Sequence, residues 1–261
     1  MSQPSFALSL GGIAFLLAVI CGEPLLRVLK RYGVGKQIRI EGPQSHMVKM
    51  GTPTMGGLLI VIPVVLITLV LNVVNIVGLT VIGRSILLPL AVLVAYAALG
   101  AWDDWEGIRG ERAGVGLGMT ARRKFALQVV IALAAGFALK YLLKAPELIF
   151  PGLPFPIELG LLYVPVAAFI ITAASNAVNF TDGLDGMAGL ISATMFAAFG
   201  VIAMMQGQVF IVRFCFTIVG ALFAFLWFNA HPAQLFMGGV GSEALGGTLG
   251  VVALMTGHWL L

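Results

Sequence analysis

Long apolar runs separated by short polar segments make up almost the whole chain. Each run is about 18 residues or longer, the length that an α-helix needs to cross the hydrocarbon core of a bilayer. The pattern predicts eight spans, near 6–27, 53–73, 79–101, 125–143, 159–176, 186–206, 209–229 and 243–261. No linker or polar insertion of domain size interrupts it. The sequence therefore predicts an all-α fold, a polytopic transmembrane helical bundle that forms a single domain over residues 1–261.

The composition favours a membrane protein over an ordinary soluble enzyme. Hydrophobic residues make up 60% of the chain, charged residues make up 10%, and the mean hydropathy is +1.05. Globular domains carry about 25% charged residues. Cys21 and Cys215 both fall inside apolar runs, so we expect neither a disulfide framework nor a zinc site. Residues 1–4 hold no basic residue, and we interpret the first run as a span and not as a cleaved signal.

Basic residues are concentrated on one side of the predicted topology. The segment after the first span holds six Lys and Arg residues, and the segment after the third span holds five. The opposite side holds the remaining four of the 15: Arg84, Lys140, Lys144 and Arg213. Because positive residues favour the cytoplasmic side, this distribution predicts an N-terminus outside the cell. All four aspartates of the chain then fall on the cytoplasmic face, where we expect any chemistry to occur.

The most polar break between two spans is Asn176–Gly186, which contains Asp182 and Asp185. If the next helix begins here, a spacing of three residues places both carboxylates on one face of its first turn. Capping of that helix would explain one aspartate. It does not explain two asparagines and two aspartates within ten residues, so we interpret the segment as a functional site.

A second acidic pair, Asp103-Asp104, follows the third apolar run between Trp102 and Trp105. Carboxylates at the C-terminus of a helix oppose its macrodipole, and adjacent carboxylates repel each other. The simpler alternative is a solvated helix end between two tryptophans at the membrane interface. We favour a site where a divalent cation or the neighbouring basic loop compensates the negative charge.

Two glycine-rich segments are predicted on the same face. Residues 36–57 combine basic side chains, hydroxyl groups and glycines, which suits a phosphate group, although a basic loop with turn glycines is the alternative. Gly-Gly-Val-Gly-Ser at 238–242 could form a phosphate-binding turn. Acidic clusters and basic glycine-rich loops in a membrane indicate phosphoryl transfer to or from a lipid. A transporter is less favoured, because the polar residues gather on one face and not at the midplane.

Together, these segments resemble the phospho-N-acetylmuramoyl-pentapeptide transferase family, one branch of the polyprenyl-phosphate sugar-1-phosphate transferases. The resemblance runs from about residue 37 to the end and rests on Glu41–His46, Gly51–Gly57, Asp103-Asp104, Asn176–Gly186 and Phe236–Ser242. It implies transfer of phospho-MurNAc-pentapeptide from its UDP carrier to undecaprenyl phosphate with Mg²⁺, giving lipid I and UMP for peptidoglycan synthesis at the bacterial inner membrane. A related transferase that attaches another UDP-HexNAc phosphate to the same lipid is an alternative.

The resemblance also implies roles for individual residues. It assigns catalysis to four aspartates, of which the last two would also bind the metal: Asp103, Asp104, Asp182 and Asp185. It assigns substrate contacts to Lys49, Thr52, Lys124, Asn176, Asn179 and Ser242. Lys124 would face the diphosphate. The implied partners are undecaprenyl phosphate, UDP-MurNAc-pentapeptide and membrane lipids; a homodimer is allowed, and no nucleic acid is expected.

Two features depart from the family's pattern. The family carries a metal-binding aspartate where this chain has Gly239, which has no ligand atom to offer. The family also continues for two further spans and a His-rich cytoplasmic motif, whereas this sequence ends at Leu261, in what would be the eighth of ten spans. Both departures favour a third possibility, a non-catalytic membrane protein of this family. On that hypothesis, Gly239→Asp in a longer chain is expected to restore turnover.

Overall fold

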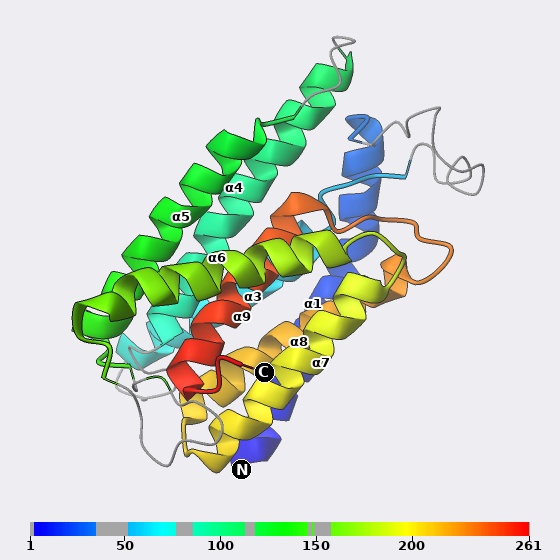
Figure 1. Ribbon diagram of the computed structural model, residues 1–261. Helices are drawn as coiled ribbons and strands as arrows, with labels where there is room; N and C mark the ends of the chain where they lie inside the picture. Colours follow the sequence, from blue (N-terminus) through cyan, green and yellow to red (C-terminus); the bar gives the residue numbers. More distant parts are fainter. Residues whose placement is uncertain are drawn as a thin grey trace.

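The computed structural model describes residues 3–34, 52–76, 86–112, 118–145, 148 and 158–260. These residues form a bundle of long helices (Figure 1). The long helices are α1 (Gln3–Arg31), α3 (Leu58–Ile76), α4 (Leu87–Arg112), α5 (Ala121–Phe137), α6 (Tyr163–Thr181), α7 (Met187–Met205), α8 (Val209–Asn229) and α9 (Gly238–Thr256). A π-helical turn (Ala138–Leu142) extends α5, and a 3-10 turn (Gly160–Leu162) leads into α6.

The predicted all-α, polytopic fold is confirmed. Within the described residues, seven helices are long and apolar enough to cross a membrane, and α3 contributes a shorter apolar stretch, Leu58–Asn72. The predicted span boundaries are less accurate at several places, of which two bear on the site. α4 continues to Arg112, well past the edge predicted near 101, and α9 begins at Gly238 instead of near 243. Hydropathy detects where a chain leaves lipid, and a helix can continue beyond that point because its hydrogen bonds are internal.

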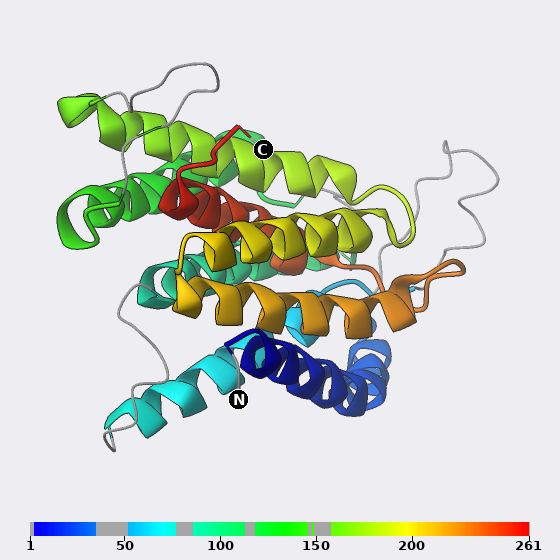
Figure 2. The same ribbon diagram turned by 90° about the horizontal axis from the view of Figure 1, so that it is seen from below.

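Helix α9 forms the centre of the bundle. Every residue from Gly238 to Thr256 except Leu249 is buried, and the helix lies between α6 and α7 while also packing against α4 (Figure 2). A Cβ atom on Gly100 of α4 would lie only 2.1 Å from the carbonyl oxygen of Gly239. Small residues allow helix backbones to approach closely in membranes, where burial from lipid gives apolar side chains little advantage.

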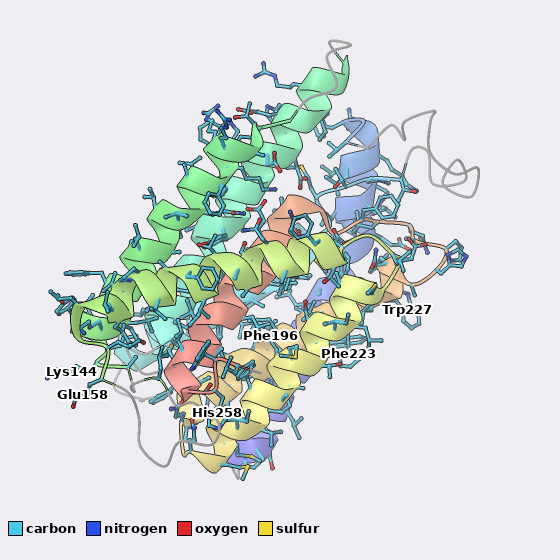
Figure 3. All side chains as sticks on the ribbon, in the orientation of Figure 1. Lys144, Glu158, Phe196, Phe223, Trp227 and His258 are labelled. Carbon is cyan, nitrogen blue, oxygen red and sulfur yellow. The ribbon has the colours of Figure 1, made fainter. Side chains whose placement is uncertain are left out.

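The helix ends gather at two opposite faces of the bundle. Lys144, Glu158 and His258 lie at the end opposite the start of α9 (Figure 3). The exposed basic residues at the end of α1, the end of α4 and the start of α5 include Arg27, Lys30, Arg31, Arg109, Arg122 and Arg123. The charge asymmetry predicted from the sequence is therefore present in the described part of the fold.

Candidate active site

Lys124 is held between two carboxylates in the first turn of α5. Its ammonium nitrogen lies 2.7 Å from Oδ2 of Asp103 and 2.5 Å from Oε1 of Glu243. The Lys124 and Asp103 side chains are 16% and 22% exposed, whereas Glu243 is completely buried. The backbone amide of Met119 donates a hydrogen bond to Oδ1 of Asp103 at 3.2 Å. The ammonium thus lies where the interior of the bundle meets its open end, and a cation there can neutralise a phosphate.

Hydrogen bonds extend from Glu243 to α6. Nε2 of Gln128 donates to Oε2 of Glu243 at 3.1 Å, and Nδ2 of Asn176 donates to Oε1 of Gln128 at 2.8 Å. Oγ of Ser175 donates to the backbone carbonyl of Glu243 at 3.2 Å. The predicted site residues Lys124 and Asn176 are therefore joined through Gln128 and Glu243.

Gln128 and Glu243 were not predicted as site residues, because Gln128 stands alone among apolar residues and Glu243 lies just outside the Phe236–Ser242 motif. A signal was nevertheless present in the sequence. Glu243 is the only acidic residue after Asp185, and a charged residue within a membrane helix marks a functional site by default. Its partner could not be identified from the sequence, since Gln128 and Glu243 are 115 positions apart.

Asp104 faces inward and caps α9. Its carboxylate accepts hydrogen bonds from the backbone amides of Gly239 at 3.1 Å and Val240 at 3.3 Å, and the residue is only 7% exposed. A carboxylate at this position satisfies amides that have no partner within the helix and complements the helix dipole. The prediction that Asp103-Asp104 ends a helix is therefore wrong. Both residues lie inside α4, and Asp104 stabilises the start of another helix.

Asn179 and Ser242, predicted from separate motifs, are brought together. Oγ of Ser242 donates to Oδ1 of Asn179 at 2.9 Å. Asn229, which was not predicted, fixes the adjacent connection: its Oδ1 accepts from the amide of Gly186 at 2.9 Å, and its Nδ2 donates to the carbonyl of Leu235 at 2.8 Å. Asn229 thereby ties the start of α7 to the segment that leads into α9.

Asp182 and Asp185 lie in the connection between α6 and α7. Asp182 is the C-cap residue of α6, and α7 begins only after Gly186, whose φ is 77°. The prediction that both carboxylates share the first turn of the next helix is wrong, because a turn with a left-handed glycine separates them from α7. Oδ2 of Asp185 lies 3.0 Å from Nδ1 of the exposed His231. His231 was not predicted to contact this segment.

The two glycine motifs pack against each other. The amides of Gly56 and Gly57 donate to the carbonyls of Phe236 and Met237, both at 2.8 Å. A Cβ atom on Gly57 would lie 2.1 Å from the backbone nitrogen of Gly241. The Gly-Gly-Val-Gly-Ser segment forms the first turn of α9, and phosphate binding by this segment stays a prediction.

The first glycine-rich segment contains three further predicted elements, of which the structure describes only Thr52. Thr52, a predicted substrate contact, is partly exposed just before the glycine junction. Lys49 and the segment Glu41–His46 lie outside the described residues. Their roles stay predictions.

Comparison with known proteins identifies the family. Residues 86–257 match the glycosyl transferase family 4. The chain belongs to this family. It is 46% identical over 262 residues to the phospho-N-acetylmuramoyl-pentapeptide-transferase of Chloroflexus aurantiacus, a match that covers 98% of this chain and 69% of the relative. The protein of the same name from Geobacillus sp. (strain WCH70) is 40% identical over 244 residues, or 94% of this chain and 73% of the relative.

The resemblance stated from the motifs is thereby confirmed. Membership of the glycosyl transferase family 4, together with relatives named for a phospho-sugar transfer, makes the chain a transferase of the glycosyl-1-phosphate type. Its apolar helices and bacterial relatives indicate a bacterial multi-pass membrane protein.

The described residues of this family 4 member fit a metal ion only in part. No group of three or more His, Cys, Asp and Glu side chains that could hold a metal ion occurs among them, and Gly239 has no donor atom. Mg²⁺, however, is commonly bound by one or two carboxylates together with phosphate oxygens and water. Asp182 and Asp185 fit such a shared site, in which the substrate completes the coordination, and do not fit a site made by protein alone.

An apolar groove between α5 and α6 leads to the same network. It has a volume of about 490 Å³ and is lined by side chains that include Phe125, Leu133, Phe169 and Asn176. The three hydrophobic side chains are exposed at the outer side of the bundle. In this transferase the groove thus joins the lipid-facing surface to Asn176, which is hydrogen bonded to Gln128.

Proposed function

We propose that this protein transfers phospho-MurNAc-pentapeptide from UDP-MurNAc-pentapeptide to undecaprenyl phosphate, producing lipid I and UMP for peptidoglycan synthesis. The observation that carries the proposal is the Lys124 ammonium, clamped by Asp103 and Glu243 at the open end of the bundle. A fixed cation beside hydrogen-bonding side chains suits a diphosphate. The choice of phospho-MurNAc-pentapeptide as the transferred group is supported by the names of the relatives.

In the proposed reaction, a phosphate oxygen of the lipid attacks the sugar-bearing phosphorus of the UDP-sugar. The bond from that phosphorus to the bridging oxygen breaks, and UMP leaves with the electron pair. A phosphate nucleophile is already largely ionised at neutral pH, so positioning and charge neutralisation dominate over proton abstraction. Asp103 already accepts from Lys124 and Met119, and we therefore assign it to positioning the ammonium.

Mg²⁺ is the proposed cofactor. Asp182 and Asp185 would hold it together with oxygens of the diphosphate. When bound, the ion supplies further neutralisation of negative charge on the phosphates. Asp104 is proposed to act indirectly, because its carboxylate fixes the start of α9, which carries Ser242.

The groove between α5 and α6 is proposed to take the polyprenyl chain of the acceptor. Its lining is apolar, and it ends at Asn176, whose amide belongs to the Lys124 network. The site would face the cytoplasm at the bacterial inner membrane, since the excess of basic residues lies on the same side as the acidic clusters.

The test is an assay of the protein in lipid nanodiscs with UDP-MurNAc-pentapeptide, undecaprenyl phosphate and Mg²⁺. Lipid I and UMP are expected in equal amounts, and Lys124→Ala is expected to lower kcat by about 100-fold because a preorganised charge is lost. Lys30→Ala is the matched control, since it removes an exposed cation at the end of α1 and should leave kcat unchanged. Equal turnover of Lys124→Ala and the unmodified protein would contradict the proposal.

Two alternatives are outcomes of the same assay. Preferential use of UDP-GlcNAc as the donor would assign the protein to the related HexNAc-1-phosphate transferases. Binding of the UDP-sugar without any product would identify a non-catalytic member of the family, the alternative that Gly239 favours.

A further inference from the structure

Glu243 is a charged side chain that the motifs leave unexplained. It lies in the second turn of α9, is completely buried, and reaches across to Lys124 and Gln128 of α5. A buried charge is costly unless it is paired and its remaining lone pairs are satisfied. Oε1 of this carboxylate is ion-paired with the Lys124 ammonium and has no hydrogen-bond partner among the described residues, while Oε2 accepts from the side-chain amide of Gln128. The ion pair with Lys124 is therefore the main compensation for the buried charge.

Glu243 occupies the space beside Gly239. The two residues are four positions apart on one helix and therefore share a face. A Cβ atom built on Gly239 would lie 3.4 Å from Oε1 of Glu243 and 3.2 Å from the carbonyl oxygen of Gly100. A side chain from position 239 would thus enter the same space between α4, α5 and α9 that the Glu243 carboxylate already fills.

We propose that Glu243 is a positioning residue of this site. Gly239 has no carboxylate, and Glu243, one turn deeper in α9, supplies one in its place. Together with Asp103 it fixes the direction of the Lys124 ammonium. An ammonium has three donors, and the contacts with Asp103 and Glu243 account for two of them among the described residues. The third remains for a phosphate oxygen. The role in transfer rests on the proposed function.

The electrostatic balance predicts a distinctive kinetic effect. Asp103, Lys124 and Glu243 together carry a net charge of −1, so Glu243 orients the cation while adding a negative charge near the substrate. Removing that charge with Glu243→Gln should lower kcat, because the ammonium loses its fixed geometry. It should not raise the KM for the UDP-sugar, because one source of repulsion is removed. A substitution that merely damages the fold would not separate the two parameters in this way.

The decisive experiment combines substitution with rescue. Glu243→Gln is expected to lower kcat at least about tenfold. Adding Gly239→Asp to Glu243→Gln returns a carboxylate to the same space from the neighbouring turn, and is expected to recover most of the lost kcat. Gly239→Asp alone is expected to reduce kcat, because two carboxylates then compete for one space. A lower kcat in Gly239→Asp alone would be the opposite of the restored turnover that the family's motif predicts for this substitution.

Thr248→Val is the matched control, since it replaces a buried polar side chain on the same helix with an isosteric one and should leave kcat unchanged. Wild-type kcat in Glu243→Gln, or a double variant no better than Glu243→Gln, would overturn the proposal. All variants are compared by thermal unfolding, so that a loss of folded protein is recognised.

A second measurement is independent of transfer. Limited acetylation of the folded protein in nanodiscs, quantified by mass spectrometry, reports how firmly the Lys124 amine is held. Glu243→Gln should increase acetylation of Lys124 several-fold and leave that of the exposed Lys30 unchanged. Unchanged labelling of Lys124 would overturn the pairing even in an active enzyme. Increased labelling in a protein without lipid I synthesis would contradict the proposed function and retain the pairing.

Discussion

Asp103 and Asp104 are consecutive residues of α4 with different environments. Successive residues of an α-helix point in directions about 100° apart, so one carboxylate reaches the partly exposed Lys124 while the other is buried against the start of α9. The two aspartates look equivalent in the sequence, but Asp103 forms an ion pair with Lys124 and Asp104 caps α9.

This division predicts that two adjacent substitutions affect different properties, one the stability and the other kcat. Asp104→Asn replaces an acceptor oxygen with a donor and removes the charge that complements α9, so the free energy of unfolding should fall by about 1–3 kcal/mol. Asp103→Asn, at a partly exposed ion pair, should change it by less than about 1 kcal/mol but lower kcat. Denaturant unfolding and the nanodisc assay measure the two quantities. An equal loss of stability in both variants would contradict the division.

At the scale of the helices, the contact between α4 and α9 depends on glycine. The backbones of Gly100 and Gly239 approach so closely that even a methyl group would overlap a carbonyl oxygen. The same crossing places the carboxylate of Asp104 at the backbone amides of Gly239 and Val240 in α9. The position of Asp104 is thus set by how closely these two helices pack.

Gly100→Ala is therefore expected to destabilise the protein by about 1–3 kcal/mol, because the helices must separate to admit the methyl group. Gly107→Ala is the control on the same helix, since no atom lies within 4 Å of the position of its Cβ. There the higher helix propensity of alanine should leave stability unchanged or raise it by up to about 1 kcal/mol. Thermal unfolding in detergent measures both variants, and a control as unstable as Gly100→Ala would show that the crossing is not the cause.

The number and order of helices could be predicted from the sequence because long apolar runs reflect the thickness of a bilayer. The end of α4 could not, since the Trp102–Arg112 segment is polar and yet remains helical. The sequence motifs and the family resemblance located Asp103, Lys124, Asn179 and Ser242, which the structure brings together in pairs. Glu243 could not be recognised as a partner of Lys124, because that contact exists only once α5 and α9 are packed.

At the scale of the whole molecule, the site is assembled from segments that are distant in the chain. Elements near residues 54, 104, 124, 176 and 242 meet around the start of α9, while Lys144, Glu158 and His258 lie at the opposite end (Figure 3). The acidic clusters and most basic residues therefore lie on one face of the bundle, and Lys144, Glu158 and His258 lie on the other. Whether a substrate can reach the site depends on which of these faces is turned toward the cytoplasm.

That orientation can be tested with single cysteines at the two faces. Cys215 is completely buried and can remain, while the half-buried Cys21 is first replaced by alanine. Glu158→Cys and Arg122→Cys then place an exposed thiol at opposite ends of the bundle. A membrane-impermeant maleimide added to intact spheroplasts should label Glu158→Cys, and it should label Arg122→Cys only after lysis, because the basic face is retained in the cytoplasm. The reverse pattern would place the Lys124 site outside the cell, where a cytoplasmic UDP-sugar could not reach it.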